Sequence, residues 1–256
     1  AGRGDNFWGP TGSEGPCGPT TEVYINDVEI WNIVFNEYYC KSDGTLEKLK
    51  TPGVDTGIGL ERLAMVSQGK QNIFETDLFL PLMEMLPAGM DTRTKRIVSD
   101  HARGVAFLLS DGVLPSNKEA GYILRRLMRR MLVYEHLSGN GYDTQTLLGK
   151  VVENYRDFYG ELNLEIIKSE FSKEKEKFQK SVARGLKELE RSNDINAQGA
   201  FRLYESFGLP FEIIKELGKE KSASLTRENF DKEFERHREA SRAGREKKFG
   251  GHGLLL

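Results

Sequence analysis

The stretch Val54-Asp55-Thr56-Gly57-Ile58-Gly59-Leu60-Glu61-Arg62 begins like a β-strand and ends like a helix. It places a carboxylate, two glycines and an arginine close together. A carboxylate can hold an ammonium group, and glycines let a ligand approach bare backbone. The forked, permanently charged arginine suits a phosphate. The stretch therefore indicates a ligand site at a strand-to-helix junction, although a tight turn with a surface salt bridge would use the same residues.

Two familiar phosphate-binding loops do not match this stretch. No Gly-Lys-Ser/Thr follows it, which excludes a P-loop. The spacing of Gly53, Gly57 and Gly59 also differs from the glycine fingerprint that binds dinucleotides after a strand. A phosphate bound at this junction must therefore be held by another geometry.

The composition is that of a globular protein rich in charge. The chain has 256 residues, 38% hydrophobic and 30% charged, enough for one large domain or two ordinary ones. No apolar run reaches membrane-spanning length, so we expect no membrane partner. Cys17 and Cys40 form no disulfide framework, which favours a cytoplasmic location. The four histidines are scattered without Cys/His spacing, so we expect no metal site and no structural zinc.

The charge is distributed unevenly along the chain. Residues 1–88 carry a formal net charge of about −7, and residues 89–256 carry about +5. Contacts with phosphates supply most of the affinity of proteins for nucleic acid. The basic rear part therefore favours a nucleic-acid partner, although a solvated helical surface would give the same excess.

Residues 1–88 are predicted to form strands and loops followed by two helices. The segment 12–19 (Gly-Ser-Glu-Gly-Pro-Cys-Gly-Pro) is interpreted as a turn-rich loop, because its prolines and glycines exclude a helix. Strands are predicted at 21–25, 28–39 and Val54, a hairpin turn at Asp43-Gly44, a chain break at Pro52-Gly53, and helices at 60–68 and 74–86. These elements are typical of an antiparallel sheet with flanking helices.

From about residue 89 onward the pattern is almost entirely helical. Helices are predicted at 96–109, 120–136, 170–189, 196–207 and 226–248. Gly208 and Pro210 are stop signals after the fourth of these. The boundary is placed within 86–92, so we predict an α+β chain with a sheet domain at 1–88 and an all-α domain at 89–256.

A series of motifs then occurs in one order along the chain. They are Asp5-Asn6-Phe7-Trp8, Gly15-Pro16-Cys17-Gly18-Pro19, Glu29-Ile30-Trp31-Asn32, the 54–62 stretch, Asp100-His101-Ala102-Arg103, Gly112-Val113-Leu114-Pro115-Ser116-Asn117, Gly121-Tyr122-Ile123-Leu124-Arg125-Arg126 and Ala200-Phe201-Arg202-Leu203-Tyr204-Glu205-Ser206-Phe207-Gly208-Leu209-Pro210. Together they resemble the alanyl-tRNA synthetase family of class II enzymes, from residue 5 to about residue 251. In this resemblance the 54–62 stretch is similar to class II motif 3, a strand and helix that carry the ATP-binding arginine.

The resemblance implies an alanine–tRNA ligase, with a partial class II antiparallel sheet followed by a helical tRNA-recognition domain. Alanine would react with ATP, helped by Mg²⁺, to give alanyl-adenylate and pyrophosphate. The alanyl group would then pass to the 3′ end of tRNA(Ala). Chemistry of this kind depends on positioning and charge stabilisation more than on a protein nucleophile. That agrees with a site that has no Ser-His or Cys-His pair.

The alanine site would be made of four matching residues. Asp55 is similar to the carboxylate that holds the alanine ammonium group, with a turn-capping Asp as the alternative. Trp8 resembles the aromatic wall of the pocket, although tryptophan is often simply core. Asn32 is similar to the amide that contacts the substrate, against a satisfied strand asparagine. Gly57 would keep the pocket floor open.

The ATP site would use three further positions. Arg62 resembles the catalytic motif 3 arginine on the terminal phosphates, with a surface ion pair as its alternative. Gly59 would leave room for the nucleotide. Glu22 would orient ATP or Mg²⁺, unless it is a buried structural glutamate.

The helical part resembles the region that recognises a G·U wobble pair in the tRNA(Ala) acceptor stem. Arg125, Arg126, Arg129 and Arg130 recur at helical spacing and predict one basic stripe suited to RNA phosphates, or else a solvated helix face. Asn117 matches the family's asparagine that reaches the wobble pair. Glu205 stands where the family usually has aspartate, and its extra methylene moves the carboxylate by about one C–C bond length.

The resemblance lacks a counterpart for motif 1 and for the first half of motif 2, with its α-phosphate arginine. Arg3 does not match that arginine. We therefore expect the chain alone to be weakly active or inactive, with the N-terminal segment and an editing domain as further partners. The alternative is a non-catalytic RNA-binding module. Retention of Trp8, Asn32, Asp55 and Arg62 favours the ligase, because an RNA-binding module does not need them.

Overall fold

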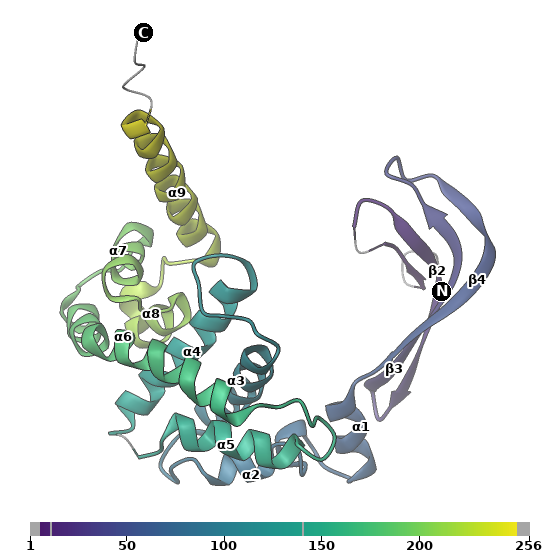
Figure 1. Cartoon of the computed structure of the whole chain (residues 1–256), viewed down its shortest axis with the longest axis horizontal. Helices are drawn as coiled ribbons and strands as arrows, with labels where there is room; N and C mark the ends of the chain where they lie inside the picture. The colour runs from purple at the N-terminus through teal and green to yellow at the C-terminus, as the bar shows by residue number, and fades with distance from the viewer. Residues whose placement is uncertain (1–5, 11, 140, 250–256) are drawn as a thin grey trace. The chain divides into compact units, whose positions relative to one another are not determined.

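The computed structural model describes residues 6–10, 12–139 and 141–249, with side chains as far as Arg238 (Figure 1). Arg3, Asp5 and His252 lie outside the described residues. The chain divides into two compact units, Ala1–Pro81 and Leu82–Leu256. The first holds a sheet with a short helix and the second is helical, which confirms the predicted α+β class. The division lies a few residues before the boundary predicted at 88/89.

The first unit is built on a four-stranded antiparallel sheet in the order β1-β2-β3-β4. Its strands are β1 (Phe7–Trp8), β2 (Gly15–Ile25), β3 (Val28–Cys40) and β4 (Leu46–Ile58). Asn26 and Asp27, both at positive φ, make the tight turn between β2 and β3. The predicted turn at Asp43-Gly44 is confirmed: Gly44 has a φ of 82° and Thr45 N donates to Asp43 Oδ1 at 2.8 Å. The strands are followed by α1 (Leu60–Ser67), a 3-10 turn η1 (Ile73–Glu75) and α2 (Leu80–Glu84).

Two predictions about the strands are wrong. The 12–19 segment is not a loop throughout, because β2 begins at Gly15 and contains both prolines. Pro19 lies where the pairing of β2 with β3 is irregular, between Cys17 and Thr20, and prolines are tolerated at such bulges. Pro52-Gly53 does not break the chain either, because β4 is continuous. Its pairing with β3 is nevertheless interrupted between Lys48 and Gly53. Pro52 thus lies in an unpaired stretch of an edge strand, where its missing N–H costs no ladder hydrogen bond.

The predicted helix at 74–86 is also wrong, since only η1 and α2 form there. Asn72 caps the 3-10 turn through a hydrogen bond from Phe74 N, and Thr76 is extended. Pro81 restricts the backbone before it and suits the first turn of a helix. Helix α2 therefore starts at Leu80 instead of continuing from the preceding turn.

The two faces of the sheet differ in character. Register places Val23 opposite Trp31, Trp31 opposite Ile58, and Phe35 opposite Val54, so these apolar side chains share one face. All five are exposed, Val54 at 64%. The opposite face carries polar residues around the buried Val34, which stands between Thr20 and Asp55, and this face holds the candidate ligand groups.

The second unit packs its helices around a single core. They are α3 (Thr92–Ser110), α4 (Glu119–Leu137), α5 (Thr144–Tyr155), α6 (Leu164–Arg191), α7 (Ala197–Phe207), α8 (Phe211–Gly218), the 3-10 turn η2 (Lys219–Ser222) and α9 (Arg227–Phe249). Helices α3, α4 and α6 contact one another and bury Leu109, Met128 and Phe171 completely. Gly208 ends α7 in the left-handed conformation, with a φ of 74°, as the stop signal predicts.

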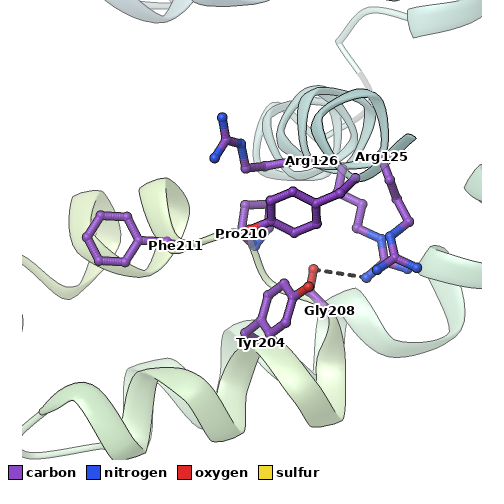
Figure 2. A pocket seen from close by; sticks show the side chains of 8 residues that line it. Arg125, Arg126, Tyr204, Gly208, Pro210 and Phe211 are labelled. Atoms are coloured by element: carbon purple, nitrogen blue, oxygen red, sulfur yellow. Dashed lines mark hydrogen bonds between the residues drawn. The ribbon is translucent and has the colours of Figure 1, made fainter. Parts of the chain in front are cut away.

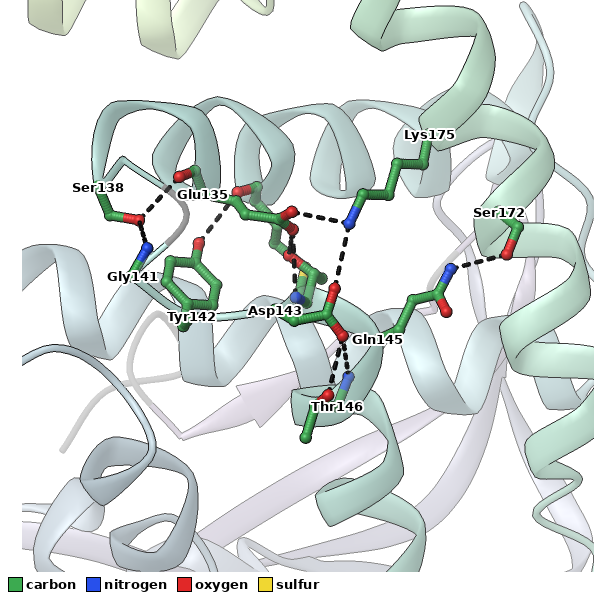
Figure 3. A network of polar contacts seen from close by, with 11 residues as sticks. Glu135, Ser138, Gly141, Tyr142, Asp143, Gln145, Thr146, Ser172 and Lys175 are labelled. Carbon is green, nitrogen blue, oxygen red and sulfur yellow. Dashed lines mark hydrogen bonds and ion pairs between the residues drawn. The ribbon is translucent and has the colours of Figure 1, made fainter.

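Two ion pairs that share Lys175 join three helices of this unit (Figure 3). Lys175 Nζ on α6 lies 2.7 Å from Glu135 Oε1 on α4 and 3.1 Å from Asp143 Oδ1, which caps α5. Glu135 also accepts from Thr144 N at 3.1 Å. Although burial opposes it, these carboxylates raise the pKa of Lys175 above its ordinary value. The network fixes the register of α4, on which several candidate functional residues lie.

Candidate functional site

Four of the predicted ligand residues gather on one face of the sheet. Glu22, Asn32 and Gly57 stand directly opposite one another across β2, β3 and β4. Asp55 precedes Gly57 by two residues, so it projects from the same face one row away. We call Glu22, Asn32, Asp55 and Gly57 the polar row. Side chains far apart in sequence thus form one local surface.

Thr20 orients the amide of Asn32, a contact that the sequence did not predict. Thr20 Oγ1 donates to Ile33 O at 3.1 Å, and it accepts from Asn32 Nδ2 at 3.1 Å. Because the amide nitrogen faces Thr20, Asn32 Oδ1 is left to accept a hydrogen bond from a ligand. The amide is therefore fixed as an acceptor.

Asp55 and Gly57 are open to solvent. Asp55 lies within β4 and not in a turn, so the turn-capping alternative does not apply. It also has no ion pair among the described residues. A Cβ placed on Gly57 would meet no atom within 4 Å, and its φ does not require glycine. Nothing in the fold therefore demands a glycine there.

Arg62 and Gly59 lie where β4 passes into α1. Gly59 N donates to Ile30 O at 3.2 Å, and Gly59 is the N-cap of α1. Arg62 Nη1 donates to Glu29 O at 2.9 Å and lies 3.3 Å from Glu29 Oε2. The surface ion pair considered for Arg62 is thus present, but the arginine side chain is still 52% exposed.

Glu22 and Trp8 are both accessible. Glu22 is exposed and accepts a hydrogen bond from Tyr24 OH, which excludes a buried structural role and raises the pKa of Tyr24. Trp8 lies on β1 opposite Gly18 and is 37% exposed, so it is not core. Gly18 has its own structural reason, because a Cβ there would collide with Phe35 O.

The arginines of α4 are paired with acids from other helices. Arg129 Nε lies 2.6 Å from Glu174 Oε1 on α6. Arg126 Nη1 lies 3.7 Å from Glu212 Oε1, and Arg130 Nη2 lies 3.5 Å from Glu216 Oε2, both on α8. Since Arg129 and Arg130 are only 18% and 14% exposed, their contacts are chiefly internal.

Arg125 differs from the other three because its described partners are neutral. Its guanidinium donates to Asn117 Oδ1. It also donates to the hydroxyl of Tyr204 on α7 (Figure 2). Arg125, Arg126, Arg129, Tyr204 and Gly208 line a small pocket between α4 and the end of α7. The four arginines are therefore brought together, but they do not form a uniform stripe.

Asn117 is held by the loop that leads into α4. Ser116 N donates to Gly121 O at 3.0 Å, and Lys118 N donates to Ser116 Oγ at 3.2 Å. A Cβ on Gly121 would collide with Ser116 Oγ, so this glycine permits the close turn. Because a guanidinium only donates, Arg125 fixes Asn117 with Oδ1 inward and leaves Nδ2 to donate to a ligand.

Glu205 on α7 is also held, by a residue that the sequence did not predict. His237 Nε2 on α9 lies 2.8 Å from Glu205 Oε1. The periodicity of Phe230, Phe234 and His237 along α9 was the available signal, since i, i+4 and i+7 share one helix face.

Neither a metal cluster nor a membrane helix is found in the part of the chain that the structure describes. Groups of three or more His, Cys, Asp or Glu side chains able to hold a metal ion do not occur there. No helix of that part is long and apolar enough to cross a membrane.

Comparison with known proteins connects the chain to one family. The family model described as tRNA synthetases class II (A) matches residues 1–252. The alanine–tRNA ligase of Borrelia hermsii is 37% identical, over 97% of this chain and 48% of its own length. Those of Treponema pallidum and Fusobacterium nucleatum are 36% and 35% identical, over 48% and 33% of their lengths. The chain thus spans about a third to a half of these curated relatives.

Proposed function

The chain belongs to the class II (A) tRNA synthetase family, and from that premise we propose that it is part of an alanine–tRNA ligase. The first unit would activate alanine with ATP, and the second would bind the acceptor stem of tRNA(Ala). The observation that carries the proposal is the polar row, in which Glu22, Asn32 and Gly57 share one register position beside Asp55. A module that only bound RNA would have no need of this arrangement.

In the first step, a carboxylate oxygen of alanine attacks the α-phosphorus of ATP. The bond from that phosphorus to the bridging oxygen breaks, and pyrophosphate leaves. Asp55 would hold the alanine ammonium group together with Asn32 Oδ1, which Thr20 keeps turned to accept. Trp8 would form the aromatic wall of the pocket, and Gly57 its floor.

The phosphates of ATP would lie toward Arg62 and Gly59. Because the Arg62 side chain is 52% exposed, its guanidinium can exchange the Glu29 carboxylate for a phosphate with little loss of hydration. Glu22 is an exposed carboxylate on the same face. One or two carboxylates together with substrate phosphates are the usual ligands of Mg²⁺, so the donor set fits that ion. When bound, Mg²⁺ would neutralise charge on the phosphates.

In the second step, the 3′-terminal ribose hydroxyl of tRNA attacks the alanyl carbonyl, and AMP leaves. The helical unit would hold the acceptor stem through Asn117 and Glu205, with Arg125 and Arg126 near the phosphates. Asn117 offers a donor and Glu205 an acceptor, which suits the edges of a G·U pair. Arg129 and Arg130 would contribute less, because glutamates already bind them.

Further partners belong to the same proposal. A small pocket rejects similar amino acids only modestly, so an editing domain would have to remove misacylated products. A cytoplasmic location is supported by the two free cysteines, Cys17 and Cys40.

The test is alanine-dependent exchange between ATP and pyrophosphate. We expect little exchange by the 256-residue chain alone and clear exchange when the N-terminal segment carrying motif 1 is supplied. Omission of alanine is the control, since exchange without it would come from a contaminant. If exchange stays absent after supplementation while an acceptor-stem hairpin still binds, the ligase proposal fails and the RNA-binding module remains.

A further inference from the structure

Glu205 is held at its carboxylate by a histidine that approaches from another helix. His237 Nε2 lies 2.8 Å from Glu205 Oε1, and both side chains are about half-exposed, at 49% and 45%. The His237 ring also lies against Phe201, with ring centroids 5.1 Å apart. Phe201 and Glu205 are one helical turn apart on α7, so one imidazole contacts both.

Helix α9 is anchored on α7 without help from this ion pair. Phe234 lies 5.7 Å from Tyr204 and 6.1 Å from Phe201, and Phe230 lies 5.8 Å from Tyr204, measured between ring centroids. Phe230 is buried. The position of His237 is therefore set by aromatic packing, and its ion pair with Glu205 is not needed to hold α9 in place.

We propose that His237 is a positioning residue that fixes the Glu205 carboxylate for RNA recognition, an inference that rests on the proposed function. Because an ionised carboxylate has no hydrogen, the Nε2 that lies 2.8 Å from Oε1 must carry one. With Oε1 occupied, Oε2 has no partner among the described residues. That oxygen remains to accept an N–H from the edge of a base.

The contact with His237 offsets the greater flexibility of glutamate compared with aspartate. Glutamate has one more rotatable bond than aspartate, and ordering that bond on RNA binding would cost entropy. The imidazole bond fixes the carboxylate beforehand, as Arg125 does for the Asn117 amide. Two recognition groups on different elements are thus both oriented before RNA arrives.

The experiment compares two acceptor-stem hairpins, one with a G·U pair and one with G·C at that position, on the 256-residue chain. Kd is measured by fluorescence anisotropy at one fixed salt concentration. H237F keeps a ring against Phe201 but loses the N–H donor, whereas H237Q keeps a side-chain N–H. H136F is the matched control, because His136 is exposed at the end of α4 and has no described contact with Glu205.

We expect H237F to lower the preference for G·U about fivefold or more, as coupling between two side chains in contact allows. H237Q should recover most of the preference, and H136F should keep it. In an E205A background, H237F should change nothing further, because His237 acts through Glu205. The melting temperature, followed by circular dichroism, should stay unchanged in H237F, H237Q and H136F.

Three results would overturn the inference. They are an unchanged preference in H237F, an equal loss in H237F and H237Q, or a further loss when H237F is added to E205A. Equal binding of both hairpins by the unaltered chain is a different failure. It would overturn the proposed G·U recognition itself, and the role of His237 with it.

Discussion

The polar row of the sheet and the arginines of α4 both gather polar side chains on one surface. They differ in whether the charged side chains have partners within the protein. Asp55 has no ion pair among the described residues, and Gly57 faces open space. Arg126, Arg129 and Arg130 each meet a glutamate from another helix. Charge left free by the fold is available for a ligand, whereas charge already paired serves the structure first.

The difference comes from how each surface is assembled. Backbone pairing sets the position of Asn32 in the sheet, so its Oδ1 is not needed to hold the strands together and is left for a ligand. Helix packing buries part of each arginine, and a buried charge must be paired. Glu174 follows Arg129 by 45 residues, and no local pattern links the two.

The largest expected effect tests the structural role of Arg129. R129M should lower the free energy of unfolding of the helical unit by about 3–5 kcal/mol, because it leaves Glu174 buried without a partner. R125M is the matched variant and should cost only about 1 kcal/mol, the value of an ordinary hydrogen bond. Urea denaturation measures both. If R129M lost no more stability than R125M, the structural role assigned to Arg129 would be wrong.

For RNA binding we expect the opposite order, with a larger effect of R125M than of R129M. R125M is expected to weaken binding of the acceptor-stem hairpin and to reduce its salt dependence by about one unit of slope if Arg125 contacts a phosphate. R129M should leave the salt slope unchanged. Titrations at several salt concentrations give the slope, and equal slopes for both variants would contradict the distinction.

The next effect concerns Asp55. D55N should raise the KM for alanine in the supplemented exchange reaction by roughly 10- to 150-fold, since a hydrogen bond to a charged group is worth about 1.5–3 kcal/mol. D43N provides the control, because Asp43 is an exposed carboxylate in a hairpin turn. An unchanged KM in D55N would remove Asp55 from the alanine site.

Gly57 should give a smaller effect of steric origin. G57A is expected to keep the melting temperature, because its new methyl group meets no protein atom within 4 Å. The same methyl group would crowd bound alanine and cost about 1–3 kcal/mol in binding. G53A, in an equally open place on β4, should alter neither quantity. A normal KM in G57A would mean that the pocket floor lies elsewhere.

The smallest effect concerns the ion pair between Glu29 and Arg62. E29Q should change stability by no more than about 1 kcal/mol, because both side chains are substantially exposed. It should also lower the KM for ATP slightly, since Arg62 no longer has to leave a carboxylate. Calorimetry and the exchange assay measure the two quantities. A higher KM for ATP would show that Glu29 orients Arg62 for the nucleotide.

The sequence predicted the fold best where structure follows local chemistry. Alternating residues indicated β3, and Asp43-Gly44 indicated the turn that follows it. Gly208 indicated the end of α7. It failed where distant packing decides, as when the edge position of β4 lets Pro52 remain in a strand. Likewise, motif matching supplied Asn32 and Glu205 but not Thr20 and His237, which orient them from other elements. Such contacts depend on the assembled fold.

The two tryptophans, Trp8 and Trp31, both belong to the first unit, and the sequence has no others. The chain therefore carries an intrinsic fluorescent label on the sheet alone, with Trp8 next to the proposed alanine pocket. Most of the helical ellipticity arises from the second unit. Emission and ellipticity recorded in one titration thus follow the two units separately, and a shift of emission on adding alanine and ATP would report ligand binding even from a chain that does not turn over.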